Sequence, residues 1–121
     1  MYRTMLRLGA LAVLSLQLGL TETHARSVVE EQVIKIEVRK FEYDRPEIIL
    51  KKGVPVVFEL TSLDRVHGFN IPDFKTRVDV VPGMVTRVRI VPDRAGTFVF
   101  FCDVFCGEGH DNMSGEIIVN N

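Results

Sequence analysis

Hydrophobic and polar residues alternate along several short segments of the chain, as they do where successive side chains point to opposite faces of a β-strand. In the first such segment, Ile34, Ile36 and Val38 share one face while charged residues occupy the other. Each segment is only four to eight residues long, which is a typical strand length. The predicted strands cover residues 32–39, 47–50, 54–61, 66–71, 76–81, 84–91, 97–102 and 115–120.

Turn-forming sequences separate these segments at short, regular intervals. Arg45-Pro46, Lys52-Gly53, Pro72-Asp73 and Pro82-Gly83 all interrupt the alternation with proline or glycine. After residue 26 we find no stretch with the spacing of an amphipathic helix. Short strands, frequent β-branched residues and closely spaced turns predict an all-β domain, built as a sandwich or barrel.

The N-terminal segment, residues 1–25, is typical of an export signal. Two arginines precede an almost wholly apolar stretch, and Thr23-His24-Ala25 ends in a small residue that suits cleavage. We therefore predict a leader at 1–25, a mature domain at 26–121 and a periplasmic or other extracytoplasmic location. The alternative is an uncleaved membrane anchor, although the apolar stretch is short for a span of about 20 residues.

The charge balance bears on the class of partner. The chain carries a formal net charge of −1. Loss of residues 1–25 would leave 13 basic and 15 acidic side chains, a net charge of −2. A nucleic-acid or anionic-membrane partner would call for a basic patch, so both are disfavoured.

Candidate metal ligands are concentrated in one segment, residues 102–113, with the sequence CDVFCGEGHDNM. It places two thiols, one imidazole and one thioether within twelve residues, and these soft and borderline donors select copper over calcium or magnesium. One more nitrogen ligand is needed from elsewhere, and His67 is the candidate. If His24 is removed with the leader, every remaining histidine and cysteine belongs to this set, which comprises His67, Cys102, Cys106 and His110, with the thioether of Met113.

Three other interpretations use the same residues. Export into an oxidising compartment would allow Cys102 and Cys106 to form a disulfide. A zinc ion would accept two cysteines and two histidines, but the spacing is not that of a zinc finger and Met113 would have no role. A mononuclear blue-copper site needs only one thiolate, so one cysteine would be left over. The second thiolate suits a site in which two copper ions share bridging sulfurs.

Residues 102–113 closely resemble the CuA-binding loop of cytochrome c oxidase subunit II, Cys-x-x-x-Cys-Gly-x-Gly-His-x-x-Met. Asp64-Arg65-Val66-His67 is similar to the Asp-x-x-His segment of that family, and Val81-Pro82-Gly83-Met84 is similar to its Pro-Gly turn. The resemblance extends over residues 32–120. It implies a cupredoxin-type Greek-key β-sandwich or barrel, which agrees with the strands predicted above.

The resemblance also implies a role for each residue of the site. Asp64 would either orient His67 or cap a turn, and Phe41 and Tyr43 would either line the site or pack in the core. The implied ligands of a binuclear CuA centre are the bridging thiolates of Cys102 and Cys106, ring nitrogens of His67 and His110, and, as weak ligands, the thioether of Met113 and the backbone carbonyl of Val104.

The function implied is one-electron transfer. Two copper ions joined by sulfur bridges spread each redox change over two centres, and full coordination by the protein leaves no position for a small-molecule substrate. The domain would then not be catalytic alone. Its partners would be redox proteins such as cytochrome c or a haem–copper oxidase subunit, which it would serve as a subunit or as a free periplasmic carrier. A copper chaperone or storage protein with a mononuclear or labile site is the alternative.

Overall fold

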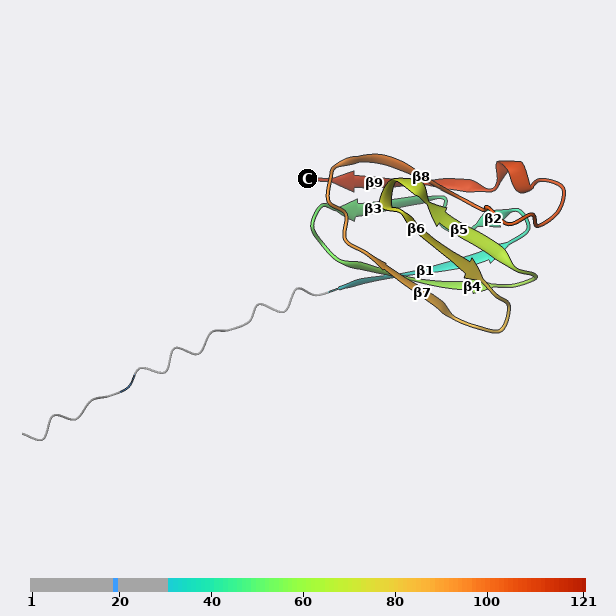
Figure 1. The fold of residues 1–121 in the computed structure, drawn as a ribbon, viewed down its shortest axis with the longest axis horizontal. Coiled ribbons are helices and arrows are strands. Elements are labelled where there is room, and N and C mark those ends of the chain that lie inside the picture. The colour runs from blue at the N-terminus through green and yellow to red at the C-terminus, as the bar shows by residue number, and fades with distance from the viewer. Residues whose placement is uncertain (1–18, 20–30) are drawn as a thin grey trace, which may run out of the picture.

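The computed structural model describes residue 19 and residues 31–121, in which all the regular structure is β-strand or single 3₁₀ turns (Figure 1). The predicted leader at 1–25 lies outside the described residues, except for residue 19. Within the described residues, no helix is both long and apolar enough to span a membrane. The elements are β1 (Gln32–Arg39), β2 (Glu42–Tyr43), β3 (Glu47–Lys51), β4 (Val56–Ser62), β5 (His67–Ile71), η1 (Pro72–Phe74), β6 (Thr76–Val80), β7 (Thr86–Ile90), β8 (Gly96–Phe101), η2 (His110–Asn112) and β9 (Ser114–Asn120).

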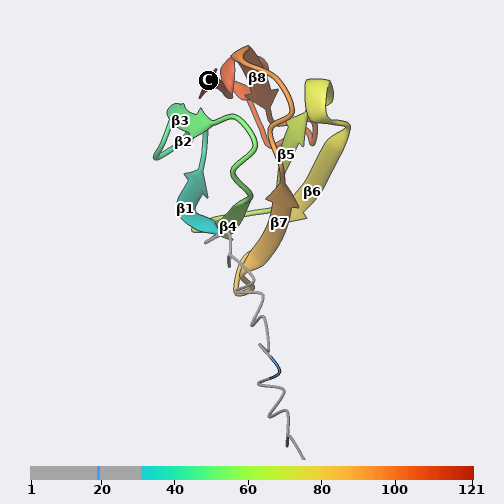
Figure 2. The same cartoon turned by 90° about the vertical axis from the view of Figure 1, so that its left-hand side faces the viewer.

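The strands form two sheets that pack against each other. One sheet has the order β2-β1-β4-β7, and the other has the order β3-β9-β8-β5-β6. Both are mixed, because β1 pairs in parallel with β4 and β3 pairs in parallel with β9. Figure 2 shows the two layers, with β1, β4 and β7 in one and β8, β5 and β6 in the other. The predicted all-β sandwich is confirmed.

The alternation seen in the sequence corresponds to burial. In β1, Ile34, Ile36 and Val38 point into the core and the residues between them are exposed. In β4, Val56, Phe58 and Leu60 are completely buried. Hydrophobic burial of this kind is the main stabilising contribution to a small sandwich.

Several bounds of the predicted strands differ from the structure; β7, for example, spans Thr86–Ile90 and not 84–91. The segment before Pro46 contains the short strand β2, because the main chain around Asp44 turns back onto β1. The backbone N–H of Glu37 donates to the Asp44 carboxylate at 2.8 Å, and the N–H of Asp44 donates to the Glu37 carbonyl at 2.9 Å. In addition, β4 begins at Val56 and not at residue 54. Pro55 has no N–H with which to extend the ladder.

An aromatic cluster fills the core between the sheets. The rings of Tyr43 and Phe100 lie 5.0 Å apart, those of Phe69 and Phe100 lie 5.1 Å apart, and those of Phe58 and Phe69 lie 5.4 Å apart. Edge-to-face and tilted contacts of this kind are favoured between aromatic rings. The same buried cluster includes Cys102, Cys106 and Met113. The predicted ligand loop therefore has its sulfur atoms anchored in the rigid core.

Candidate metal centre

The candidate site lies at one end of the sandwich, where loops from both sheets meet. In Figure 1 the segment between β8 and β9, which includes η2, lies at the same end as β2 and the connection from β4 to β5. The loop is closed on itself, since the N–H of Cys102 donates to the Met113 carbonyl at 3.0 Å. His67 is the first residue of β5. The topology thus brings His67 to a loop that lies 35 or more residues later in the chain.

The ligand loop turns sharply beneath the ring of Phe41. Gly109 has φ of +100°, and a Cβ there would lie 2.8 Å from a carbon of the Phe41 ring. Glycine meets both requirements because it has no Cβ. Of the two aromatic residues named by the sequence, Phe41 contacts the loop. Tyr43 belongs to the core, where its hydroxyl donates to the Gly68 carbonyl at 2.7 Å and burial raises its pKa.

The sulfur atoms of the loop converge. Cys102 Sγ and Cys106 Sγ are 3.9 Å apart, and Cys106 Sγ is also 3.9 Å from Met113 Sδ. The Val104 carbonyl oxygen lies 3.1 Å from Cys102 Sγ, and His110 Nδ1 lies 3.5 Å from Cys106 Sγ. Five of the six predicted ligands are therefore in mutual reach within one loop.

His67 completes the group from β5, which lies next to β8 in the same sheet. Its side chain is fully buried, and its ligand atom lies within 4.8 Å of both cysteine sulfurs. Its Nδ1 is the one buried side-chain nitrogen or oxygen without a hydrogen-bond partner among residues 31–121. An unpaired buried polar atom is costly unless another group satisfies it. The structure thus brings together all six residues singled out in the sequence.

Asp64 fixes the orientation of the His67 ring. Asp64 Oδ1 lies 2.6 Å from His67 Nε2, and its carboxylate also accepts hydrogen bonds from the backbone N–H groups of Lys40 and Arg65. Partial desolvation opposes ionisation, but these hydrogen bonds outweigh it and lower the pKa of Asp64 to about 2. The ionised carboxylate accepts from Nε2–H, which leaves Nδ1 as the nitrogen with a free lone pair. Both roles considered for Asp64, orienting the ring and capping the turn, occur together.

The Cys106 side of the loop carries an arginine contact. Arg65 Nη1 donates to the Cys106 carbonyl at 3.0 Å. Burial and the neighbouring Cys102 raise the pKa of the Cys106 thiol to about 11, although the charge of Arg65 acts in the opposite direction. Without a metal ion, burial thus favours the neutral thiol of Cys106 over the thiolate. Thiolate ligation must release its proton.

The chemistry of the donor set fits copper. Both cysteines are free, so the disulfide considered from the sequence is not what the structure contains. A zinc ion held by the cysteines and histidines would leave the Met113 thioether without a role, although the Met113 sulfur lies 3.9 Å from Cys106 Sγ. Thiolate, imidazole and thioether together are a copper-preferring combination.

Several residues at the site carried no recognisable signal in the sequence. Gly68 donates its N–H to Cys102 Sγ at 3.3 Å, and Asp103 is held by Arg77 of β6. These contacts depend on how the strands pair, which one sequence does not reveal. Gly115 lies in β9, within the strand predicted at 115–120, and a Cβ there would come 2.3 Å from the Phe100 ring. Its role is close packing.

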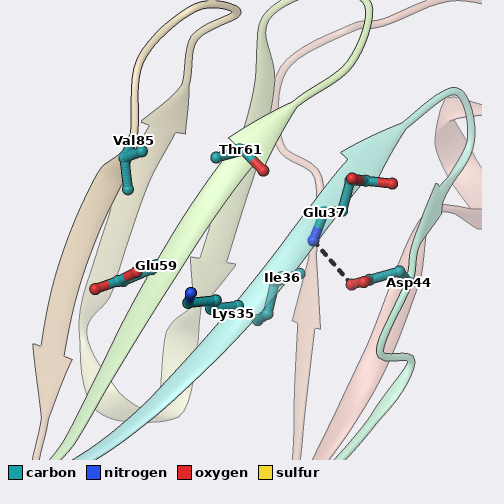
Figure 3. A pocket seen from close by; sticks show the side chains of 7 residues that line it. All are labelled: Lys35, Ile36, Glu37, Asp44, Glu59, Thr61 and Val85. Carbon is teal, nitrogen blue, oxygen red and sulfur yellow. Dashed lines mark hydrogen bonds between the residues drawn. The ribbon is translucent and has the colours of Figure 1, made fainter.

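Two surface hollows differ in their relation to the site. One, of about 390 Å³, opens beside the ligand loop and is lined by Phe101, Cys102, Asp103, His110, Asp111 and Met113. The other, of about 300 Å³, contains none of the predicted ligands (Figure 3). It is lined by Lys35, Ile36, Glu37, Asp44, Glu59, Thr61 and Val85.

Comparison with known proteins agrees with the fold. A family model described as a cupredoxin-like domain matches residues 9–119. The chain belongs to the cupredoxin-like family. This cupredoxin-like chain is similar to cytochrome c oxidase subunit 2 of Thermus thermophilus, with 39% identity over 79 residues, which cover 65% of this chain and 58% of that protein. It spans about half the length of the first curated relatives that it matches.

Solved structures give the same result. The periplasmic domain of subunit II of cytochrome oxidase from Bradyrhizobium japonicum superimposes with a TM-score of 0.69 at 19% identity, over 74% of this chain and 84% of that one. At that identity the likeness concerns the fold alone. A chain of a heme-copper terminal oxidase dimer gives a TM-score of 0.67 at 33% identity, over 74% of this chain and 65% of that one. These comparisons confirm the predicted cupredoxin-type fold.

Proposed function

We propose that this protein holds two copper ions in a CuA-type centre and transfers single electrons. The observation that carries the proposal is the convergence of six donors on the two cysteine sulfurs, and one of these donors is the buried Nδ1 of His67, which has no hydrogen-bond partner within residues 31–121. Similarity to cytochrome c oxidase subunit 2 supports the same assignment. When bound, the paired copper ions would supply a centre that accepts and releases one electron.

Each residue of the chain would have a distinct part. The proposed bridges are the thiolates of Cys102 and Cys106, and the weak ligands are Met113 Sδ and the Val104 carbonyl. His67 would bind through Nδ1, because its Nε2–H donates a hydrogen bond to the Asp64 carboxylate. His110 would bind through a ring nitrogen that faces Cys106 in the structure.

Burial of the donors favours electron transfer over catalysis. Cys106, Met113 and His67 are at most 1% exposed, so water is largely kept from the centre. The donors come from a loop anchored in the core, so they need to move little when the charge of the centre changes. A site filled by protein ligands leaves no position at which a substrate would bind, and we propose no small-molecule substrate.

We further propose that the protein works outside the cytoplasm with other redox proteins. The structural relative at 33% identity is part of a heme-copper terminal oxidase, and the curated relative from Thermus thermophilus is a cytochrome c oxidase subunit 2. A donor such as cytochrome c and an acceptor such as a haem–copper oxidase subunit fit this context. The leader predicted at residues 1–25 belongs to the same proposal.

The test begins with protein whose cysteines have been reduced to thiols and which is then loaded with copper. Visible and electron paramagnetic resonance spectra are recorded on the oxidised centre. We expect a purple species that contains two copper ions and one unpaired electron shared between both nuclei. Hyperfine splitting from a single copper nucleus would contradict the binuclear site. Copper that is lost readily to a chelator and shows no reversible redox couple would instead identify a copper chaperone or storage protein.

A further inference from the structure

The residue after the first cysteine of the ligand loop, Asp103, is held by β5 and β6, which belong to the same sheet as the strands that flank the loop. The Asp103 carboxylate accepts hydrogen bonds from Arg77 Nε at 2.5 Å and from Arg77 Nη2 at 3.0 Å. Asn70 Nδ2 adds a third contact at 3.3 Å. Asn70 and Arg77 are directly paired in the β5–β6 ladder, so both donors stand on regular strands. A two-pronged contact between arginine and carboxylate fixes direction as well as distance.

The Asp103 carboxylate occupies space that only glycine leaves free. A Cβ on Gly68 would lie 2.0 Å from Asp103 Oδ1 and 2.9 Å from the Asp103 backbone nitrogen. The backbone of Gly68 meanwhile donates to Cys102 Sγ at 3.3 Å and accepts from the Tyr43 hydroxyl at 2.7 Å. The carboxylate of Asp103 and the sulfur of Cys102 therefore both rest on the same residue of β5.

The two cysteines of the ligand loop are held differently. At the Cys106 side, Arg65 comes from the connection between β4 and β5 and donates one hydrogen bond to a carbonyl. At the Cys102 side, Arg77 is the second residue of the edge strand β6 and donates two. The Cys102 side thus has the stiffer support. Asp103 lies directly between Cys102 and Val104, two of the proposed ligands.

We propose that Arg77 and Asp103 form a clamp that positions Cys102 Sγ and the Val104 carbonyl for copper. The clamp touches no metal and acts through the backbone on either side of Asp103. This inference rests on the proposed function, because it assigns a purpose to the clamp at that site. Removing partners that orient metal ligands typically costs about 10–100-fold in metal affinity, which sets the size of the expected effect.

The experiment compares four variants of the purified protein with a matched control, and the fourth variant is Arg77→Lys. Arg77→Gln and Asp103→Asn each break the clamp with little change of shape, and the third variant combines both substitutions. Arg87→Gln is the control, because Arg87 forms a similar exposed contact with Glu59, 3.3 Å away between β7 and β4. Glu59 lies on the face drawn in Figure 3, which contains none of the proposed ligands.

Copper affinity, measured by competition with a chelator, and the reduction potential are the first readouts. We expect each single variant to bind copper about 10-fold or more weakly and to shift the potential. The double variant should be little weaker than the weaker single variant, since both changes remove the shared Arg77–Asp103 contact, and the separate ion pair of Arg77 with Asp79 at 2.7 Å lies outside the clamp. Arg77→Lys, which keeps the charge but loses the two-pronged geometry, should recover only part of the affinity. The clamp is overturned if all variants match Arg87→Gln.

A second readout does not require copper. In the reduced, metal-free protein, we expect Arg77→Gln and Asp103→Asn to accelerate alkylation of Cys102 relative to Cys106, as located by peptide mass mapping. Unchanged alkylation together with unchanged copper binding would overturn the clamp. Accelerated alkylation in a protein that binds no copper would overturn the proposed function and leave the clamp standing. Thermal unfolding of each variant beside Arg87→Gln separates a local change in the loop from general loss of structure.

Discussion

Asp64 Oδ1 lies 2.6 Å from Nε2 of the buried His67, three residues further along the chain. This contact determines which nitrogen of the ring carries the proton, and so which one is free. Because the carboxylate also receives two backbone N–H groups, it ties the ring to the turn that precedes β5. One exposed carboxylate thereby controls the direction of a ligand that has no exposed surface.

We expect Asp64→Ala to weaken copper binding by about 10–100-fold, because the His67 ring loses the group that fixes its tautomer and orientation. Asp64→Asn keeps an acceptor oxygen and should lose less. Asp73→Asn, on the exposed η1 turn, is the control and should retain the affinity of the parent. Competition with a copper chelator measures all three, and equal affinity of Asp64→Ala and the parent would contradict the orienting role.

Cys106→Ser should abolish the binuclear centre and leave at most one bound copper ion. A serine hydroxyl is a poor substitute for a bridging thiolate, and the remaining donors suffice only for a mononuclear site. Copper stoichiometry and the electron paramagnetic resonance spectrum provide the measurement. Cys102→Ser should behave in the same way, since the two sulfurs are proposed as equivalent bridges. An unchanged two-copper signal in either variant would refute the ligand assignment.

Met113→Leu should retain two copper ions and shift the reduction potential. Leucine has nearly the same volume, so the fully buried site should tolerate it at a cost below about 1.5 kcal/mol. A weak axial thioether tunes the potential more than it holds the metal. Met84→Leu, at a position that is 61% exposed, is the matched control and should change neither quantity. Complete loss of copper from Met113→Leu would mean that Met113 is a strong ligand.

The ligand loop was predictable because its donors are close in sequence. Cys102, Cys106, His110 and Met113 lie within twelve residues, so their spacing alone pointed to one site. His67 required the additional argument that few other nitrogen ligands exist, together with the Asp-x-x-His resemblance. The strands were predictable for a similar reason, since alternation is a local property that burial on one face imposes.

Other features depended on pairing between distant segments. Arg77 and Asp103 are separated by 26 residues and meet only because of the register of β5, β6 and the ligand loop. The two-residue strand β2 is too short for alternation to reveal it. Alternation placed Gly115 in a predicted strand, but it could not reveal the Phe100 ring that packs against this glycine.

Gly115→Ala should destabilise the metal-free protein by about 1–3 kcal/mol, because overpacking forces neighbouring atoms to move. The new Cβ would lie 2.3 Å from the Phe100 ring and 2.5 Å from the Pro46 carbonyl oxygen, and neither backbone nor core ring yields easily. Chemical denaturation measures the free energy of unfolding. Thr97→Ala, at an exposed position on the adjacent strand β8, is the control and should change stability far less.

Arg65→Gln should lower the reduction potential of the copper-loaded protein. The guanidinium donates to the Cys106 carbonyl at 3.0 Å, so its positive charge lies near a proposed ligand. A nearby positive charge favours the reduced state, which carries one positive charge fewer, and its removal favours the oxidised state. We expect a shift on the order of tens of millivolts at low ionic strength, and a smaller one in high salt, where exposed charges are screened.

Two further variants separate charge from geometry at this position. Arg65→Lys retains the positive charge and should keep most of the potential, even though the fixed hydrogen bond is lost. Arg87→Gln removes an equal charge from the opposite sheet and should leave the potential nearly unchanged. Voltammetry at two salt concentrations measures all three variants. If Arg65→Gln and Arg87→Gln give the same potential, or if the shift does not shrink in salt, Arg65 does not act through its charge on the centre.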